Sequence, residues 1–169
     1  GTGTGCILLS CLASMPMAQG TGTDIHPATL TVAEDNARAL NLSSRARFLF
    51  SDWFTAVPGR FDLILSNPPY IAEEEMGSLS PEVLREPRRA LTPGGDGLDA
   101  YRAIATGAPA RLMPGGRLIV EIGPTQGTAV ATLFAAQGLT DIRILPDLDG
   151  RDRVVAARKP QDDTGCGTA

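Results

Sequence analysis

The stretch FDLILSNPPY, residues 61–70, indicates the fold of this chain more clearly than any other. Its first six residues are mostly apolar and have the length of a buried strand, which stops at Asn67-Pro68-Pro69-Tyr70. Both prolines have a fixed φ and lack a backbone N–H, and each disfavours the helical conformation in the residue before it. We therefore expect a stiff, extended segment, rich in hydrogen-bond acceptors, at the end of a strand.

The Asn67-to-Tyr70 segment has the groups needed to hold a planar amine. The side-chain oxygen of Asn67 and the carbonyl oxygen of Pro68 can face the same point, where an –NH2 group would offer them two donors. The ring of Tyr70 could cover such a flat group from one side. This arrangement suits an amide or exocyclic amine that is about to be alkylated. A simple proline turn after a buried strand is the alternative for these four residues alone.

Length and composition suit one globular domain. We place that domain at residues 1–160 of the 169, and we expect a disordered tail at 161–169. The content of 43% hydrophobic and 20% charged residues is ordinary for a soluble protein. No apolar run approaches the roughly 20 residues needed to cross a bilayer. We therefore expect a cytoplasmic protein with no membrane partner.

The net charge and the small number of cysteines and histidines argue against two kinds of site, one for nucleic acid and one for a metal. The net charge of −4 argues against direct binding of nucleic acid, although Arg85, Arg88 and Arg89 could form a local basic patch. The three cysteines form no C-x-x-C pair and the chain has a single histidine, so we expect no metal site.

Strands alternate with helices along most of the chain. The expected strands lie at 22–25, 47–50, 61–66, 117–122, 142–145 and 153–157, and the expected helices at 5–13, 27–42, 98–113 and 125–137. A long loop is expected from the end of the third strand to residue 97. This order predicts an α/β fold with a doubly wound, Rossmann-like parallel sheet. Because no helix separates the last two strands, they should form a C-terminal antiparallel hairpin.

A glycine-rich turn, Gly1-Thr2-Gly3-Thr4-Gly5, precedes the first expected helix. Glycines let the backbone approach a ligand and adopt positive φ, and the helix start offers unpaired N–H groups to a carboxylate. The dinucleotide fingerprint G-x-G-x-x-G is not present. The turn alone is compatible with either a ligand site or only a tight turn.

Acidic residues follow the next two strands. Asp24 lies about 20 residues after the turn, the spacing at which an acid binds ribose hydroxyls in doubly wound folds, although it could only cap the following helix. Asp52 and Trp53 follow the next strand, and Trp53 could stack on a flat ring or simply be a core residue. These features and Asn67 fall at the ends of successive strands, which predicts one shared site.

Asn67-Pro68-Pro69-Tyr70 at a strand end resembles the substrate motif of S-adenosylmethionine-dependent methyltransferases that modify planar nitrogens. The resemblance implies catalytic roles for Asn67, Pro68, Pro69 and Tyr70, with S-adenosylmethionine as cofactor. It implies that the 1–5 turn and Asp24 bind the methionine and ribose parts of the cofactor. Asp52 would accept the adenine amino group and Trp53 would cover the adenine ring, while Asn67 would lie at the junction with the cofactor.

Further segments are similar to the release-factor glutamine N5-methyltransferases. They are Glu86-Pro87, Ala90-Leu91, 94–99, Tyr101-Arg102, Glu121-Ile122-Gly123, Gln126-Gly127 and 147–153. Arg85 departs from the pattern, because an aromatic residue is expected there. The resemblance implies that the substrate is the glutamine of a Gly-Gly-Gln tripeptide in a peptide-chain release factor. We also expect the protein to be a monomer. A ribosomal-protein glutamine methyltransferase, an amino-methyltransferase acting on adenine N6 or guanine N2, and a non-catalytic cofactor-binding module are the alternatives.

In the resembled family, a central strand and a helical domain precede the glycine turn, and this sequence begins at the turn itself. We therefore expect the first, central strand and the N-terminal helical domain to be missing. A buried central strand contributes on the order of 10 kcal/mol, at about 1.5–3 kcal/mol for each large apolar side chain. The expectation is that residues 1–169 alone fold poorly, bind S-adenosylmethionine weakly and do not methylate release factor. A comparison of their melting and methyl transfer with those of an upstream-extended chain would test it.

Overall fold

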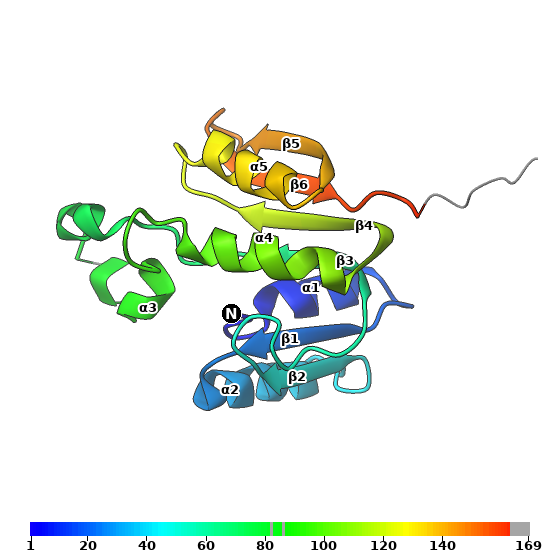
Figure 1. The fold of residues 1–169 in the computed structure, drawn as a ribbon. Coiled ribbons are helices and arrows are strands. Elements are labelled where there is room, and N and C mark those ends of the chain that lie inside the picture. The colour runs from blue at the N-terminus through cyan, green and yellow to red at the C-terminus, as the bar shows by residue number, and fades with distance from the viewer. Residues whose placement is uncertain (82, 86, 163–169) are drawn as a thin grey trace, which may run out of the picture. The chain divides into compact units, whose positions relative to one another are not determined.

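The computed structural model describes residues 1–81, 83–85 and 87–162. It divides into two compact units, Gly1–Gly59 and Arg60–Ala169 (Figure 1). The expected disordered tail falls mainly on residues 163–169, which lie outside the described residues, as does Glu86. The expected domain boundary at residue 160 remains a prediction.

The first unit is a two-stranded parallel sheet with two helices. Strand β1 (Gly20–Asp24) pairs with β2 (Ala46–Phe50) in a register that runs from Gly20 opposite Ala46 to Asp24 opposite Phe50. Helix α1 (Cys6–Ser14) precedes β1, and α2 (Pro27–Ala39) connects the strands. The arrowheads of both strands and the N-terminus lie on the same side of this unit (Figure 1). The glycine turn therefore lies at the carboxyl edge of the sheet.

Glycine in β1 allows α1 to pack closely on the strand. A Cβ on Gly20 would lie 2.3 Å from Cδ1 of Leu8, a separation that real Cβ atoms do not show. Side chains of both helices and of the segment after α2 form a core cluster beside β2, and its buried members are Leu9, Leu12, Ala37 and Leu42. Helix α2 ends at Ala39, earlier than the expected residue 42, because the chain turns at Asn41, which has a φ of 58°.

The second unit is a four-stranded sheet in the order β3-β4-β6-β5. Strand β3 (Phe61–Ser66) pairs in parallel with β4 (Leu112–Glu121), as expected for a doubly wound fold. Strand β6 (Asp152–Arg158) is antiparallel both to β4 and to β5 (Thr140–Pro146). The C-terminal antiparallel hairpin is confirmed, and its second strand lies between β4 and the edge strand β5.

Two helices cover the second sheet. Figure 1 shows α4 (Asp99–Arg111) along β4 and α5 (Gly127–Ala136) over the hairpin. The largest fully buried side chains in this unit come from both helices and from the inner strands, and they include Tyr101, Ile104, Leu118, Val120, Phe134 and Val155. The Lys159 ammonium group donates to the carbonyl oxygens of Pro109, at 2.8 Å, and Leu112, at 3.0 Å. A cation is favourable there because the C-terminal carbonyls of a helix carry partial negative charge.

Besides the end of α2, two further segments differ from their predicted structure. The expected long loop contains the 3-10 helices η1 (Glu73–Ser78) and η2 (Val83–Arg85) and the short helix α3 (Arg88–Leu91). Strand β4 begins at Leu112, although its Pro-Gly-Gly sequence predicts a turn at 114–116. That segment is held beside the end of β6, because the Gly115 N–H donates to the Lys159 carbonyl at 3.1 Å and the Lys159 N–H donates to the Gly116 carbonyl at 2.9 Å.

The α/β class and the order of the elements are confirmed. The described strands form two sheets rather than one continuous sheet, and among them β1 pairs only with β2. Of the helices in the described residues, none has the length and apolar character needed to span a membrane.

Candidate functional site

Asp24, the last residue of β1, organises the glycine turn. Its Oδ2 accepts the Gly3 N–H at 3.0 Å, and its Oδ1 accepts the His26 N–H at 3.0 Å. The Thr2 N–H donates to the Thr23 carbonyl at 2.6 Å, which extends the contact between turn and strand. The Asp24 side chain is buried, yet a carboxylate has about four acceptor positions. Asp24 therefore supports the turn and the start of α2 while it keeps capacity for another donor.

The glycine turn combines an open face with a crowded one. Gly3 has a φ of 55°, and a Cβ there would meet nothing within 4 Å. Gly5 has a φ of 82°, and a Cβ there would lie 3.2 Å from Cβ of Ala33, so a side chain at Gly5 would be crowded. Asn36 of α2 donates to the Thr4 carbonyl at 2.9 Å and so ties the turn to that helix. The open face, next to the N-terminus of α1, can accept a ligand carboxylate.

The segment after β2 is held by a residue that the sequence did not single out. Ser51 is buried, and its N–H donates to the Asp24 carbonyl at 3.0 Å, so the two strand ends are tied together. Its hydroxyl donates to the Trp53 carbonyl and accepts the Ala56 N–H, both at 3.0 Å. The only sequence signal for Ser51 is a small polar residue directly after a strand.

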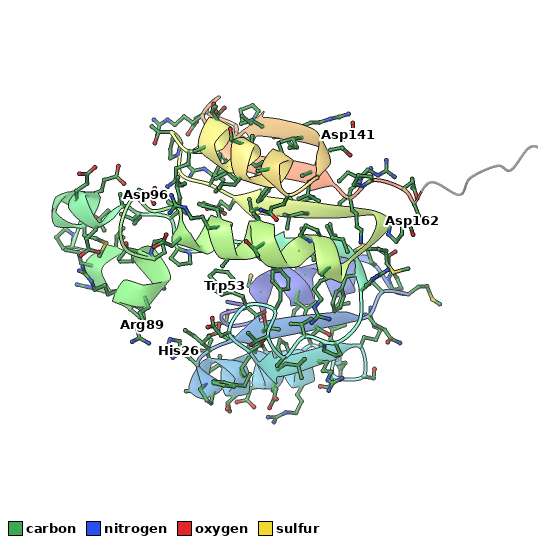
Figure 2. All side chains as sticks on the ribbon, in the orientation of Figure 1. His26, Trp53, Arg89, Asp96, Asp141 and Asp162 are labelled. Atoms are coloured by element: carbon green, nitrogen blue, oxygen red, sulfur yellow. The ribbon has the colours of Figure 1, made fainter. Side chains whose placement is uncertain are left out.

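Trp53 has an uncommon backbone conformation for a bulky residue, with a φ of 47°. Its side chain is half-buried and labelled in Figure 2, and the preceding Asp52 is exposed. A bulky residue keeps a positive φ only where its surroundings impose it. Here the Ser51 hydroxyl holds the Trp53 carbonyl by a hydrogen bond. The predicted residues Asp24, Asp52 and Trp53 thus lie at one edge of the first sheet, beside the glycine turn.

The Asn67-to-Tyr70 segment follows β3 in the second unit. Asn67 is exposed, and among the described residues its side chain has no hydrogen-bond partner. Pro68 is buried, while Pro69 and Tyr70 are half-buried. The structure therefore leaves the Asn67 amide available for a ligand on a backbone that two prolines restrict.

The Tyr70 backbone is anchored by residues distant in sequence. Gln126 donates from Nε2 to the Tyr70 carbonyl at 2.8 Å. The next residue, Ile71, donates its N–H to the Leu91 carbonyl at 3.0 Å, and the Glu73 N–H donates to the Gly95 carbonyl at 3.1 Å. These contacts fix the exit of the segment against the β4–α5 turn, the end of α3 and the loop that precedes α4.

Tyr101 of α4 lies under the same region. It is fully buried, and its hydroxyl donates to the Glu121 carbonyl at 2.9 Å, at the end of β4. Burial raises the pKa of the Tyr101 phenol well above its ordinary value, and the charges of Tyr70 and Glu121 add to this shift. Tyr101 is therefore a neutral structural donor.

Comparison with known proteins accounts for this combination of features. A family model described as "Methyltransferase small domain" matches residues 1–98, more than half of the chain. The chain belongs to this methyltransferase family. A release factor glutamine methyltransferase from Cereibacter sphaeroides is 64% identical over 161 residues, which are 95% of this chain and 58% of that protein. Another, from Rhodospirillum rubrum, is 51% identical over 94% of this chain and 49% of that protein. The chain thus spans about half the length of these curated relatives.

Solved structures agree on the fold. A methyltransferase from Pyrococcus furiosus superposes with a TM-score of 0.69 at 17% identity, over 95% of this chain and 72% of that one. A ribosomal protein L11 methylase from Lactobacillus delbrueckii subsp. bulgaricus gives a TM-score of 0.63 at 23% identity, over 94% of this chain and 67% of that one. At these identities the similarity supports the methyltransferase fold alone.

A compact ion-pair network joins the start of α4 to the loop before it in this methyltransferase chain. The Arg102 guanidinium contacts the Asp96 carboxylate at 2.6 Å and the Asp99 carboxylate at 2.7 Å. The Leu98 N–H also donates to Asp96 at 3.0 Å. Arg102 first, and then the Leu98 N–H, lower the pKa of Asp96 to about 2. Asp96 and Arg89 are labelled on this part of the chain in Figure 2.

We predict that Arg102→Gln returns the Asp96 pKa toward the usual aspartate range, measured by NMR titration of the carboxyl carbon. Because the folded pKa is depressed, the pair contributes stability above the ordinary aspartate pKa, and this contribution is lost as pH falls toward about 2. Arg60→Gln is the matched control, since Arg60 is exposed and makes no ion pair among the described residues. An unchanged Asp96 titration in Arg102→Gln would contradict the assigned cause.

The predicted basic patch is partly neutralised. Arg88 forms an ion pair with Glu73, while Arg85 in η2 and Arg89 in α3 are exposed. Arg85, the departure from the family pattern, is the last residue of η2. Among the described residues, no group of three His, Cys, Asp or Glu side chains is arranged to hold a metal ion.

Proposed function

We propose that this chain, as part of the whole protein, binds S-adenosylmethionine and holds a glutamine side chain for N5-methylation, with the Gly-Gly-Gln motif of a peptide-chain release factor as substrate. The observation that carries the proposal is the exposed Asn67 amide, which has no partner among the described residues and follows a strand on a backbone stiffened by two prolines. Relatives that are 64% and 51% identical are named as release factor glutamine methyltransferases, which supports this substrate class.

The residues of the first unit fit the proposed cofactor. The open face at Gly3 and the start of α1 offer N–H groups to a carboxylate. Asp24 would accept ribose hydroxyls with its remaining lone pairs, while Asp52 would accept the adenine amino group beside the Trp53 ring. Bound S-adenosylmethionine would supply a methyl group on a positively charged sulfur, which leaves as a neutral thioether.

The second unit supplies the groups that would act on the amide. A carboxamide nitrogen is a poor nucleophile because its lone pair is delocalised into the carbonyl. The Asn67 side-chain oxygen and the Pro68 carbonyl would accept its two hydrogens, and these bonds strengthen as positive charge develops on nitrogen. Stabilisation of this kind favours the transition state over the bound substrate. After transfer, the methylated nitrogen is acidic enough to lose a proton to water.

The alternatives differ in the molecule that presents the nitrogen. A ribosomal-protein glutamine methyltransferase would use the same chemistry. An amino-methyltransferase of DNA or RNA would need a surface that binds phosphates, which the net charge of −4 and the pairing of Arg88 with Glu73 disfavour. A non-catalytic cofactor-binding module would not need the Asn67-to-Tyr70 segment.

A parallel assay of radiolabelled methyl transfer separates these possibilities. The protein is incubated with labelled cofactor and a release factor, the same release factor with the Gly-Gly-Gln glutamine replaced by alanine, ribosomal proteins, or nucleic acid. We expect label only on the unaltered release factor. Equal label on the alanine variant, or label only on ribosomal protein or nucleic acid, would overturn the proposed substrate. Cofactor binding by calorimetry without transfer to any acceptor would favour the non-catalytic module.

Asp24→Ala tests the cofactor half of the proposal. We expect cofactor binding to weaken by about 1.5–3 kcal/mol, because the acceptor for the ribose and the support of the Gly3 N–H are both lost. This corresponds to roughly 10- to 150-fold in the dissociation constant, measured by isothermal titration calorimetry. Asp149→Ala, which truncates an exposed aspartate in the β5–β6 turn, should leave affinity unchanged. Unchanged affinity in Asp24→Ala would limit Asp24 to a structural role.

A further inference from the structure

Gln126 occupies the turn between β4 and α5, and both ends of its side-chain amide are hydrogen-bonded. Its Nε2 donates to the Tyr70 carbonyl at 2.8 Å, and its Oε1 accepts the Gly123 N–H at 3.0 Å. Tyr70 is 56 residues away in sequence, so the contact joins the β4–α5 turn to the segment after β3. Only a group with a donor and an acceptor side by side can make both bonds.

The space around this contact leaves little room for a side chain at Gly97 or Gly123. A Cβ on Gly97 would lie 2.5 Å from the Tyr70 carbonyl oxygen and 3.0 Å from Nε2 of Gln126. A Cβ on Gly123 would lie 3.0 Å from Oε1 of Gln126 and 3.3 Å from the Tyr70 ring. The loop at Gly97 and the β4–α5 turn therefore meet at the Tyr70 carbonyl group, and the loop can approach it this closely only because Gly97 has no Cβ.

Fixing the Tyr70 carbonyl restricts the residues before it. Pro68 and Pro69 each have a fixed φ, so few soft dihedral angles separate Tyr70 from the Pro68 carbonyl and from Asn67. We call the Asn67 side-chain oxygen and the Pro68 carbonyl oxygen the amide clamp, because they are the two acceptors proposed to hold the substrate amide. A restraint at Tyr70 therefore also restricts the positions of these two acceptors. The exposed Asn67 side chain has no restraint of its own among the described residues.

We propose that Gln126 is a positioning residue for the amide clamp: by holding the Tyr70 carbonyl, it sets the direction of the Pro68 carbonyl and the Asn67 side chain. The inference rests on the proposed function for the identity of the held group. It extends that function by assigning the orientation of the clamp to a residue that need not touch the substrate. If these two acceptors point in the wrong direction, kcat should fall more than the affinity for substrate, because their alignment matters most in the transition state.

The test compares Gln126→Glu and Gln126→Leu with Gln137→Glu, a control at an exposed glutamine at the end of α5. An ionised carboxylate can accept the Gly123 N–H but cannot donate to the Tyr70 carbonyl. We expect Gln126→Glu at neutral pH to lower kcat for methyl transfer by at least about tenfold, with KM for release factor and the cofactor dissociation constant changed less than about threefold. The control should match the wild type.

A second measurement reports on the anchor, the hydrogen bond from Gln126 to the Tyr70 carbonyl, and does not depend on activity. We expect the Ile71 amide, which is next to the anchored carbonyl, to lose at least about tenfold in hydrogen-exchange protection in both Gln126 variants. Lowering the pH should restore protection and kcat in Gln126→Glu alone, because a protonated carboxyl group can donate to the Tyr70 carbonyl. Gln126→Leu should show no recovery.

The outcomes separate this inference from the proposed function. If the wild type does not methylate release factor, the proposed function fails while Ile71 protection still tests the anchor. If Ile71 protection falls but kcat and KM stay at wild-type values, the anchor exists and Gln126 does not position the clamp. Unchanged protection and unchanged kcat in Gln126→Glu, or equal recovery at low pH in Gln126→Leu, would overturn the inference.

Discussion

Asn67→Ala is expected to abolish methyl transfer while it weakens cofactor binding by no more than about tenfold, or about 1.4 kcal/mol. The substitution removes one of the two acceptors that would hold the amide hydrogens, and the Pro68 carbonyl alone cannot orient the nitrogen. Because Asn67 is exposed and makes no hydrogen bond among the described residues, the free energy of unfolding should change by less than about 0.5 kcal/mol.

The measurements are single-turnover methyl transfer, calorimetric cofactor binding and thermal melting of the same preparation. Together they separate a lost chemical step from a lost cofactor or a lost fold. A variant that keeps more than about a tenth of wild-type turnover would remove Asn67 from the mechanism.

Gly97→Ala is expected to have the second large effect, at a position that touches no substrate in the proposed function. Gly97 has a φ of 78°, and an added Cβ would lie 2.5 Å from the Tyr70 carbonyl oxygen and 3.1 Å from the Ala72 nitrogen. Both neighbours are backbone atoms, so the contact can be relieved only if the loop or the Asn67-to-Tyr70 segment moves. We expect methyl transfer to fall at least about tenfold, and the melting temperature to fall as well.

Gly94→Ala provides the matched control for Gly97→Ala. Gly94 also has positive φ, at 92°, but a Cβ there would meet nothing within 4 Å. Both variants therefore carry the backbone strain of about 1–2 kcal/mol for a side chain in the left-handed region, and only Gly97→Ala adds the clash. Equal activity of the two variants would show that the close approach at Tyr70 does not matter for methyl transfer.

The fold was predictable where it depends on local pattern. The alternation of strands and helices predicted the α/β class. The absence of a predicted helix between the last two strands predicted the C-terminal hairpin, which the antiparallel pairing of β6 with β5 confirms. The helices η1 and η2 were not predicted, because 3-10 turns of this length lack a hydrophobic period. The early start of β4 was also missed, since Gly115 and Gly116 are held by contacts with Lys159, which is distant in sequence.

The residues of the candidate site could be predicted from the sequence, but the hydrogen bonds that hold them in place could not. Sequence placed Asp24 and Asn67 at strand ends, where parallel sheets gather ligand-binding groups. It could not show that both oxygens of Asp24 accept backbone N–H groups, or that Ser51 and Gln126 hold the neighbouring segments. These contacts join residues by tertiary packing, and a single polar residue in a turn carries no periodic signal.

The cofactor and substrate roles of the predicted site residues remain predictions, as does a cytoplasmic location. The measurement that tests the central claim most directly is tandem mass spectrometry of a release factor incubated with the protein and S-adenosylmethionine. The account predicts one added methyl group on the side-chain nitrogen of the glutamine in Gly-Gly-Gln, absent from the Asn67→Ala reaction. A methyl group on any other residue, or an unmodified glutamine in a reaction that methylates nucleic acid, would contradict it.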